Sequence, residues 1–169
     1  AVGKNSMRDQ IRERYYNEWL RLARDTCDFI GVQNYERKVW NDKGPLPAPA
    51  DARRNAGGIE VWPGSLAGAV RYAHEVTKLP VYVTEHGVNS EDDALRQWLI
   101  PAALAELKRA MDDGVPVRGY FHWSLIDNFE WGFGYHHRFG LHSFDRETFK
   151  RTAKPSAEVL GSIARKNSL

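Results

Sequence analysis

Three short apolar segments separated by helical patterns constrain the fold of this chain more than any other feature. They are Asp28–Tyr35, Val81–Glu85 and Val115–Trp123. Each is an apolar run with little polar alternation, which is typical of a strand buried on both faces. Strands that alternate with helices form right-handed parallel βαβ units. The sequence therefore predicts an α/β domain whose strands end at one common rim.

Helical periodicity fills most of the remaining chain. Apolar residues recur at steps of four and three from Met7 to Leu22, and Ser6 and Asp9 stand where an N-cap and a capping-box acid would. Further helices are expected from Pro63 to before Pro80, from the turn at 89–93 to Gly114, and over Pro155–Lys166. Pro101 predicts either a kink in the third of these helices or a helix that begins near it.

The number of strands limits the architecture. A closed (β/α)8 TIM barrel needs eight strands and about 250 residues, whereas this chain has 169 residues and three strand patterns. If the chain is barrel material, it is a piece of a barrel with two unpaired sheet edges. Residues 36–58, rich in proline and glycine, predict a long connection of the kind that is usually functional or mobile.

Charge and cysteine content exclude several functions. The 24 Lys and Arg against 22 Asp and Glu are interspersed, so no basic surface for nucleic acid is expected. No run approaches the roughly 18 apolar residues of a membrane span, and the polar stretch Ala1–Asp9 lacks a signal core, so a cytoplasmic location is expected. Cys27 is interpreted as a small buried hydrophobe, and the histidines lack metal-ligand spacing, so neither a metal nor a cofactor is predicted.

Polar side chains follow each predicted strand: Gln33-Asn34-Tyr35, Thr84-Glu85-His86-Gly87 and Trp123-Ser124. An amide, a phenol, a carboxylate and an indole would therefore meet at one rim. This set suits a sugar, since hydroxyls bind carboxylates and amides and the ring face stacks on tryptophan.

Two motifs carry a resemblance to a known family. Thr84-Glu85-His86-Gly87 resembles the nucleophile motif Thr-Glu-Asn-Gly of glycoside hydrolase family 1, and the segment 119–131, continued at 134–135 and 138–141, is similar to that family's C-terminal signature. Segments 28–35 and 60–63 also match family segments. The resemblance implies that residues 1–169 are the C-terminal part of one (β/α)8 glycosidase domain. It would hold the last three βα units and an extra N-terminal helix, and would lack the N-terminal strands.

The resemblance also implies a role for each matching residue. Glu85 would be the nucleophile of a retaining hydrolysis of β-D-glucosides or related β-glycosides, and Tyr35 would hold it ionised and aimed. Sugar-binding residues would be Gln33, Trp123 as the floor, Glu130 for the 4- and 6-hydroxyls, Trp131 for the 3-hydroxyl and Phe139 as a wall. A carboxylate at Glu130 favours an unphosphorylated sugar.

Departures from the family pattern leave the activity of this chain open. His86 and Gln33 stand where the family has asparagine, and His86 could become charged near neutral pH. The Asn-Glu-Pro motif of the acid/base is missing, because the pair Asn17-Glu18 precedes Trp19 in a predicted helix. We therefore expect either a complementary N-terminal barrel portion or self-association.

Each residue also has a less specific interpretation. Taken alone, Glu85 could be an ion-pair partner, Tyr35 a half-buried strand residue, Trp123 and Trp131 core aromatics, and Glu130 part of a polar turn. The alternatives for the whole chain are a non-catalytic sugar-binding or structural half-barrel, or a truncated chain without a function of its own.

Overall fold

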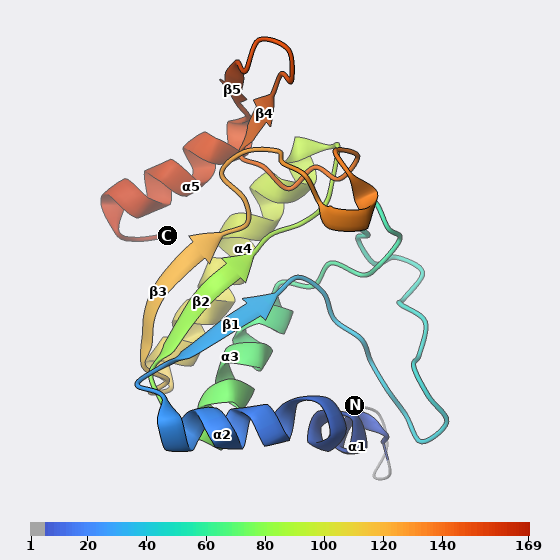
Figure 1. Ribbon diagram of the computed structural model, residues 1–169, viewed down its shortest axis with the longest axis vertical. Coiled ribbons are helices and arrows are strands. Elements are labelled where there is room, and N and C mark those ends of the chain that lie inside the picture. The colour runs from blue at the N-terminus through green and yellow to red at the C-terminus, as the bar shows by residue number, and fades with distance from the viewer. Residues whose placement is uncertain (1–5) are drawn as a thin grey trace.

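The computed structural model describes residues 6–169, so residues 1–5 of the polar N-terminal stretch lie outside it. Its helices and strands are, in chain order, α1 (Arg8–Arg12), the π-helical turn η1 (Glu13–Asn17), α2 (Glu18–Thr26), β1 (Ile30–Asn34), α3 (Gly64–Thr77), β2 (Val81–His86), α4 (Asp93–Asp112), β3 (Val117–His122), the 3-10 turn η2 (Trp131–Phe133), β4 (His142–Phe144), β5 (Arg151–Ala153) and α5 (Pro155–Lys166) (Figure 1).

The three predicted strands form one parallel sheet in the order β1-β2-β3. Val81 of β2 lies in register with Ile30 on one side and Val117 on the other. The crossovers run through α3 and α4, and the strands end at the same edge of the sheet (Figure 1). The predicted parallel α/β arrangement is confirmed, and the outer edges of β1 and β3 pair with no further strand among residues 6–169.

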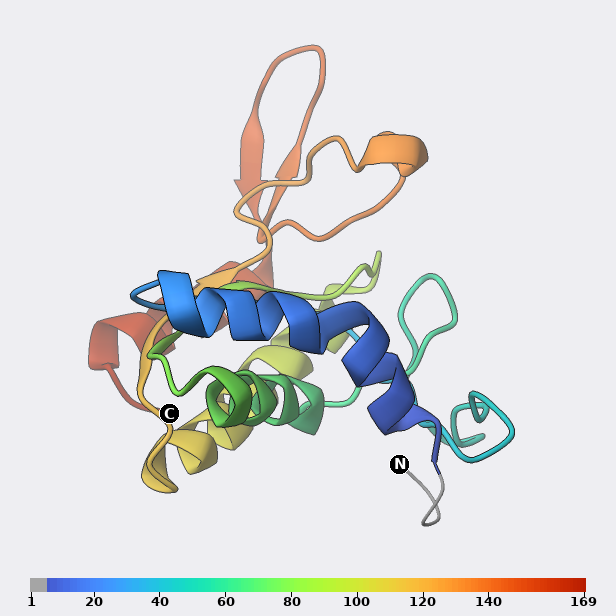
Figure 2. The ribbon, with the colours of Figure 1, turned by 60° about the horizontal axis from the view of Figure 1, so that its bottom comes forward.

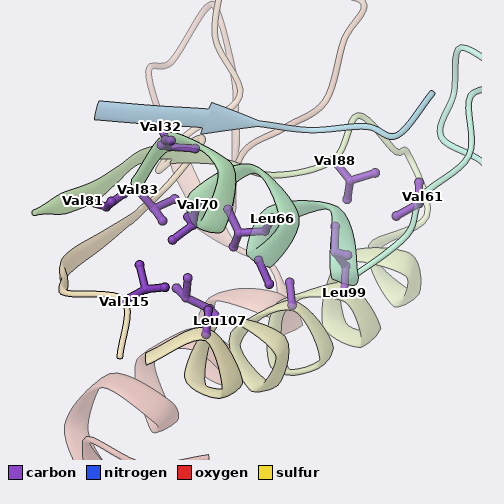
Figure 3. Packing of buried hydrophobic residues seen from close by; sticks show 14 residues of the cluster. Val32, Val61, Leu66, Val70, Val81, Val83, Val88, Leu99, Leu107 and Val115 are labelled. Carbon is purple, nitrogen blue, oxygen red and sulfur yellow. The ribbon is translucent and has the colours of Figure 1, made fainter. Parts of the chain in front are cut away.

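The hydrophobic core lies between the sheet and the helices α3 and α4 (Figure 3). Val81, Val83, Leu66 and Val70 have no exposed surface, and Leu107 of α4 is also buried. Burying each such side chain contributes about 1.5–3 kcal/mol relative to leaving it exposed. The packing of these valines explains why residues 30–34 and 81–86 form strands under helices.

The other face of the sheet is open, so the expectation of strands buried on both faces is wrong for this chain. Figure 1 shows α3 and α4 behind the sheet. Gln33 and Thr84 are exposed, and Phe29 and Phe121 are 52% and 59% exposed. The apolar strand composition therefore reflects one packed face and one face whose side chains have no cover among the described residues.

The first helix forms, but its predicted apolar face does not pack. Tyr15, Trp19 and Leu22 are each more than half exposed, while Leu20 packs against the core. The Ser6 hydroxyl accepts a hydrogen bond from the Arg8 amide at 3.2 Å. The predicted capping box is absent from this helix because the Asp9 carboxylate pairs with Arg8 instead.

Three other expectations can be compared with the structure. The helix α4 begins at Asp93, capped by the Asp92 carboxylate, and runs through Pro101, so a start near Pro101 is wrong. Cys27 is exposed rather than buried. Among residues 6–169, no helix has the length and apolar character needed to cross a membrane.

The hairpin of β4 and β5 projects from the rest of the chain (Figure 2).

Candidate active site

Glu85, near the carboxyl end of β2, accepts hydrogen bonds from two side chains: one lies in β1 and the other directly follows β1. The Gln33 side-chain amide donates to Glu85 Oε1 at 2.8 Å, and the Tyr35 hydroxyl donates to Glu85 Oε2 at 2.5 Å. The register of β1 and β2 shifts between Val32 and Gln33, which places Gln33 opposite Glu85. Such an irregularity re-aims a side chain at the end of a strand, and here it brings the amide to the carboxylate.

The electrostatics of this pair assign the proton to the phenol. Burial, followed by the hydrogen bond to Glu85, raises the pKa of Tyr35 far above its ordinary value, so Tyr35 stays protonated and donates. Within the described chain Glu85 forms no ion pair with a lysine or arginine. The interpretation of Glu85 as an ion-pair partner is therefore wrong for the described residues. The carboxylate accepts hydrogen bonds from two neutral donors instead.

The segment after β3 brings three more predicted residues to this rim. The Phe139 ring meets the Tyr35 ring edge-on, with centroids 5.5 Å apart. The Trp123 indole Nε1 donates to Glu130 Oε1 at 3.0 Å. The Trp123 amide donates to the His86 carbonyl, which joins the end of β3 to the residue after Glu85. The Trp123–Ser124 peptide bond is cis.

Trp131 stands apart from the other predicted site residues. It begins η2 and is 85% exposed. Its indole donates no hydrogen bond to any of residues 6–169. The structure thus joins Gln33, Tyr35, Glu85 and Phe139, pairs Trp123 with Glu130, and leaves Trp131 open to solvent.

A buried ion pair that the sequence did not reveal anchors the segment carrying Phe139. The Asp127 carboxylate accepts from the Gly140 amide and from Lys154 Nζ, each at 2.9 Å, and Lys154 Nζ also donates to the Gly140 carbonyl. A Cβ at Gly140 would lie 2.1 Å from the Asp127 nitrogen. Only glycine fits this close approach. No local sequence pattern predicts the contact with Lys154.

His86, at the end of β2, and His122, at the end of β3, share the hydroxyl of Tyr120. Nδ1 of His86 lies 2.9 Å and Nδ1 of His122 lies 3.3 Å from that oxygen. One hydroxyl carries one proton, so one imidazole accepts from it and the other donates to it. Burial lowers the pKa of His86 to about 4 and that of His122 to about 3. The expectation that His86 becomes charged near neutral pH is therefore wrong, because a buried imidazolium loses its hydration.

The long connection over residues 36–58 is tied to the rest of the chain. Arg37 pairs with the buried Glu60 through two hydrogen bonds and stacks over Trp62 at 4.0 Å. The Asn55 side chain donates to Glu36 at 2.6 Å. With residues 58–60 this connection lines a cavity of about 330 Å³. Among residues 6–169 no cluster of His, Cys, Asp and Glu has the arrangement of a metal site.

The parallel strands, their crossover helices and the polar rim define a segment of a (β/α)8 barrel whose sheet is not closed. Comparison with known proteins places this segment. The chain belongs to glycosyl hydrolase family 1, whose sequence profile matches residues 2–169. The resemblance seen in the two motifs is confirmed.

Relatives and solved structures agree with this assignment. A β-galactosidase of Sulfolobus acidocaldarius is 34% identical over 86% of this chain and 33% of its own length. β-Glucosidase A of Thermotoga maritima is 32% identical over 96% of this chain and 40% of its length. The apo structure of a β-glucosidase designated 1317 superposes with a TM-score of 0.91 at 40% identity, covering all of this chain and 41% of that one. The chain thus spans about two-fifths or less of these relatives.

Proposed function

We propose that this chain is the C-terminal part of a retaining β-glycosidase that hydrolyses unphosphorylated β-D-glucosides or related β-glycosides, with Glu85 as the nucleophile. The observation that carries the proposal is the placement of Glu85 at the strand rim, where Gln33 and Tyr35 bind its two oxygens and no cation from residues 6–169 pairs with it. Two hydrogen bonds from neutral donors fix the orientation of this side chain for attack.

The reaction would proceed in two displacements. Glu85 would attack the anomeric carbon, forming a C–O bond to the sugar as the bond to the leaving group breaks, and water would then hydrolyse the glycosyl-enzyme. Tyr35 would keep one carboxylate oxygen hydrogen-bonded while the other attacks. The leaving group needs a proton, and the acid/base that supplies it would belong to the barrel strands outside this chain.

The sugar would lie against the aromatic residues of the rim. The Trp123 ring would form the floor, with its indole nitrogen holding Glu130 Oε1. Glu130 Oε2 would then accept hydroxyls of the sugar, and its charge would repel a phosphate. Phe139, in contact with Tyr35, would form the wall, and the exposed Trp131 would close on the 3-hydroxyl.

Full activity would require a complementary barrel portion. The open edges of β1 and β3 support this proposal, as does the length of the relatives, of which this chain covers 33% to 41%. Without general acid catalysis the leaving group must depart as an anion, which costs roughly two to four orders of magnitude in rate. A dinitrophenolate leaves without a proton, so an aryl glycoside of this kind loses least.

Hydrolysis of 2,4-dinitrophenyl β-D-glucoside tests the proposal. We expect release of dinitrophenolate by the chain, a large gain when a barrel portion with the missing strands is added, and loss of both in Glu85→Gln. Glu91→Gln is the matched control, because Glu91 is an exposed acid in the loop after the same strand. Saturable glucoside binding without release would support the non-catalytic sugar-binding module instead, and full activity in Glu85→Gln would refute the nucleophile.

A further inference from the structure

Arg96 is a buried cation that has no role in the proposed sugar-binding site. It lies in the first turn of α4, where the helix dipole disfavours positive charge, and its side chain has no exposed surface. Its one ion-pair partner is Asp93 Oδ1 at 2.5 Å, and its Nε has no hydrogen-bond partner among residues 6–169. A buried charge at an unfavourable helix position needs compensation, so the remaining hydrogen bonds of Arg96 must stabilise it.

Those contacts join the two loops that follow the site strands. Arg96 Nη2 donates to the Ser90 carbonyl at 2.9 Å and to the Arg138 carbonyl at 2.6 Å, and Val88 O lies 3.4 Å away. Ser90 belongs to the loop after the nucleophile strand, whereas Arg138 precedes Phe139 in the segment after β3. One guanidinium nitrogen therefore links both sides of the site.

A second clasp reinforces the same junction. The Arg138 amide donates to Asn89 Oδ1 at 2.9 Å, and the Ser90 amide donates to the Arg138 carbonyl at 3.1 Å. The next residue, Phe139, contacts Tyr35, which holds Glu85. Contacts thus run without interruption from the Arg96 guanidinium through Phe139 to the nucleophile.

We propose that Arg96 is a positioning residue: it fixes the segment carrying Glu130, Trp131 and Phe139 at its working distance from Glu85. This inference rests on the proposed glycosidase function. It adds a residue outside the sugar-contacting set whose loss would weaken sugar binding more than chemistry, because Glu85 itself is held by strand pairing and by Gln33.

The chemistry of the site requires arginine and not merely a cation. The planar guanidinium directs one nitrogen to Asp93 and another to the two carbonyls at the same time. Asp93 is itself engaged by the Ser156 amide and hydroxyl at 2.8 and 2.7 Å, so α5 is tied to the same point. A lysine supplies the charge at a single nitrogen and cannot span both sets of acceptors.

The test compares Arg96→Lys and Asn89→Ala with the unsubstituted chain. Asn89→Ala removes the hydrogen bond from the Arg138 amide to Asn89 Oδ1 while leaving the Arg96–Asp93 ion pair intact, so it tests the same junction if the arginine variant does not fold. Arg109→Met is the matched control: Arg109 lies on the same helix, pairs with an acid three residues earlier, and is exposed. Inactivation by 2,4-dinitrophenyl 2-deoxy-2-fluoro-β-D-glucoside gives KI and kinact separately, and amide hydrogen exchange reports on the loops.

We expect Arg96→Lys to raise KI about tenfold, as for loss of one hydrogen bond to a charged group. Asn89→Ala removes a hydrogen bond between neutral groups and should raise KI about fivefold. We expect kinact to change little in both variants. The Ser124 amide, which donates to the Phe139 carbonyl and touches neither substituted residue, should exchange faster, while Val83 in the sheet should not. Unchanged KI and Ser124 exchange, or uniformly faster exchange throughout the sheet, would overturn the inference. If the unsubstituted chain takes no label, the proposed function fails, and the exchange pattern alone decides the role of Arg96.

Discussion

The buried pair His86 and His122 predicts that the folded chain loses stability in mild acid. Both imidazoles are neutral in the folded state because burial lowers the pKa of His86 to about 4 and that of His122 to about 3. In the unfolded chain each returns to an ordinary pKa near 6.5. Below that pH the unfolded state therefore binds more protons than the folded state, and the free energy of unfolding decreases as the pH falls.

The size of the effect follows from the difference in pKa between the folded and the unfolded state. For His86 the gap is 2.5 pKa units, the difference between 6.5 and about 4, and each unit corresponds to about 1.4 kcal/mol. His86 alone thus costs about 3 kcal/mol by pH 4, and His122 adds a cost of similar size over the same range. A domain of this kind is stable by about 5–15 kcal/mol, so the pair removes a large part of its stability.

Urea unfolding followed by circular dichroism at pH 7.5, 6.5, 5.5 and 4.5 measures this slope. We expect His86→Asn, which removes one of the two imidazoles, to flatten the decline between pH 6.5 and 4.5. His136→Asn, at an exposed loop position, should leave it unchanged. A free energy of unfolding that is constant over this range, or an equal decline in His86→Asn, would show that the two imidazoles are not the source of the acid instability.

Two other substitutions, with Gly68→Ala as the control for the second, test the packing of the site. Tyr35→Phe keeps the contact with Phe139 but removes the donor to Glu85, so labelling by the fluoroglucoside should slow by about tenfold to a hundredfold, the loss of one charge-assisted hydrogen bond; an unchanged rate would contradict the assigned donor. Gly140→Ala places a Cβ 2.1 Å from the Asp127 nitrogen and should destabilise the chain by about 3 kcal/mol in urea unfolding. In Gly68→Ala, on the helix α3, the new Cβ meets nothing within 4 Å, so stability should rise by about 0.5–1 kcal/mol; equal effects at the two glycines would contradict the packing.

The parts of the site that follow from strand order could be predicted from the sequence. Glu85 and Tyr35 end neighbouring parallel strands, so their meeting at one rim is a consequence of βαβ topology. The Gln33 contact needs the register shift after Val32, which no local pattern announces. The exposed apolar face of the first helix likewise shows that periodicity predicts a helix and an apolar face, but not what packs there.

The residues that support the site could not be read from the chain. Asp127 and Lys154 pair across 27 residues of sequence, and Arg96 reaches the Arg138 carbonyl across 42 residues. In the sequence these residues look like ordinary surface charges. One signal was present: an arginine in the first turn of a helix opposes the helix dipole and needs a compensating partner. For His122 the sequence shows only a histidine at the end of a strand, and its burial is a property of the fold.

Peptide mapping by mass spectrometry after incubation with the 2-deoxy-2-fluoro glucoside shows whether Glu85 is the nucleophile. We expect a single fluoroglucosyl group, attached to the side chain of Glu85 and absent when Glu85→Gln is treated in the same way. A label on Glu130 or on another carboxylate, or saturated binding with no covalent product after prolonged incubation, would contradict it.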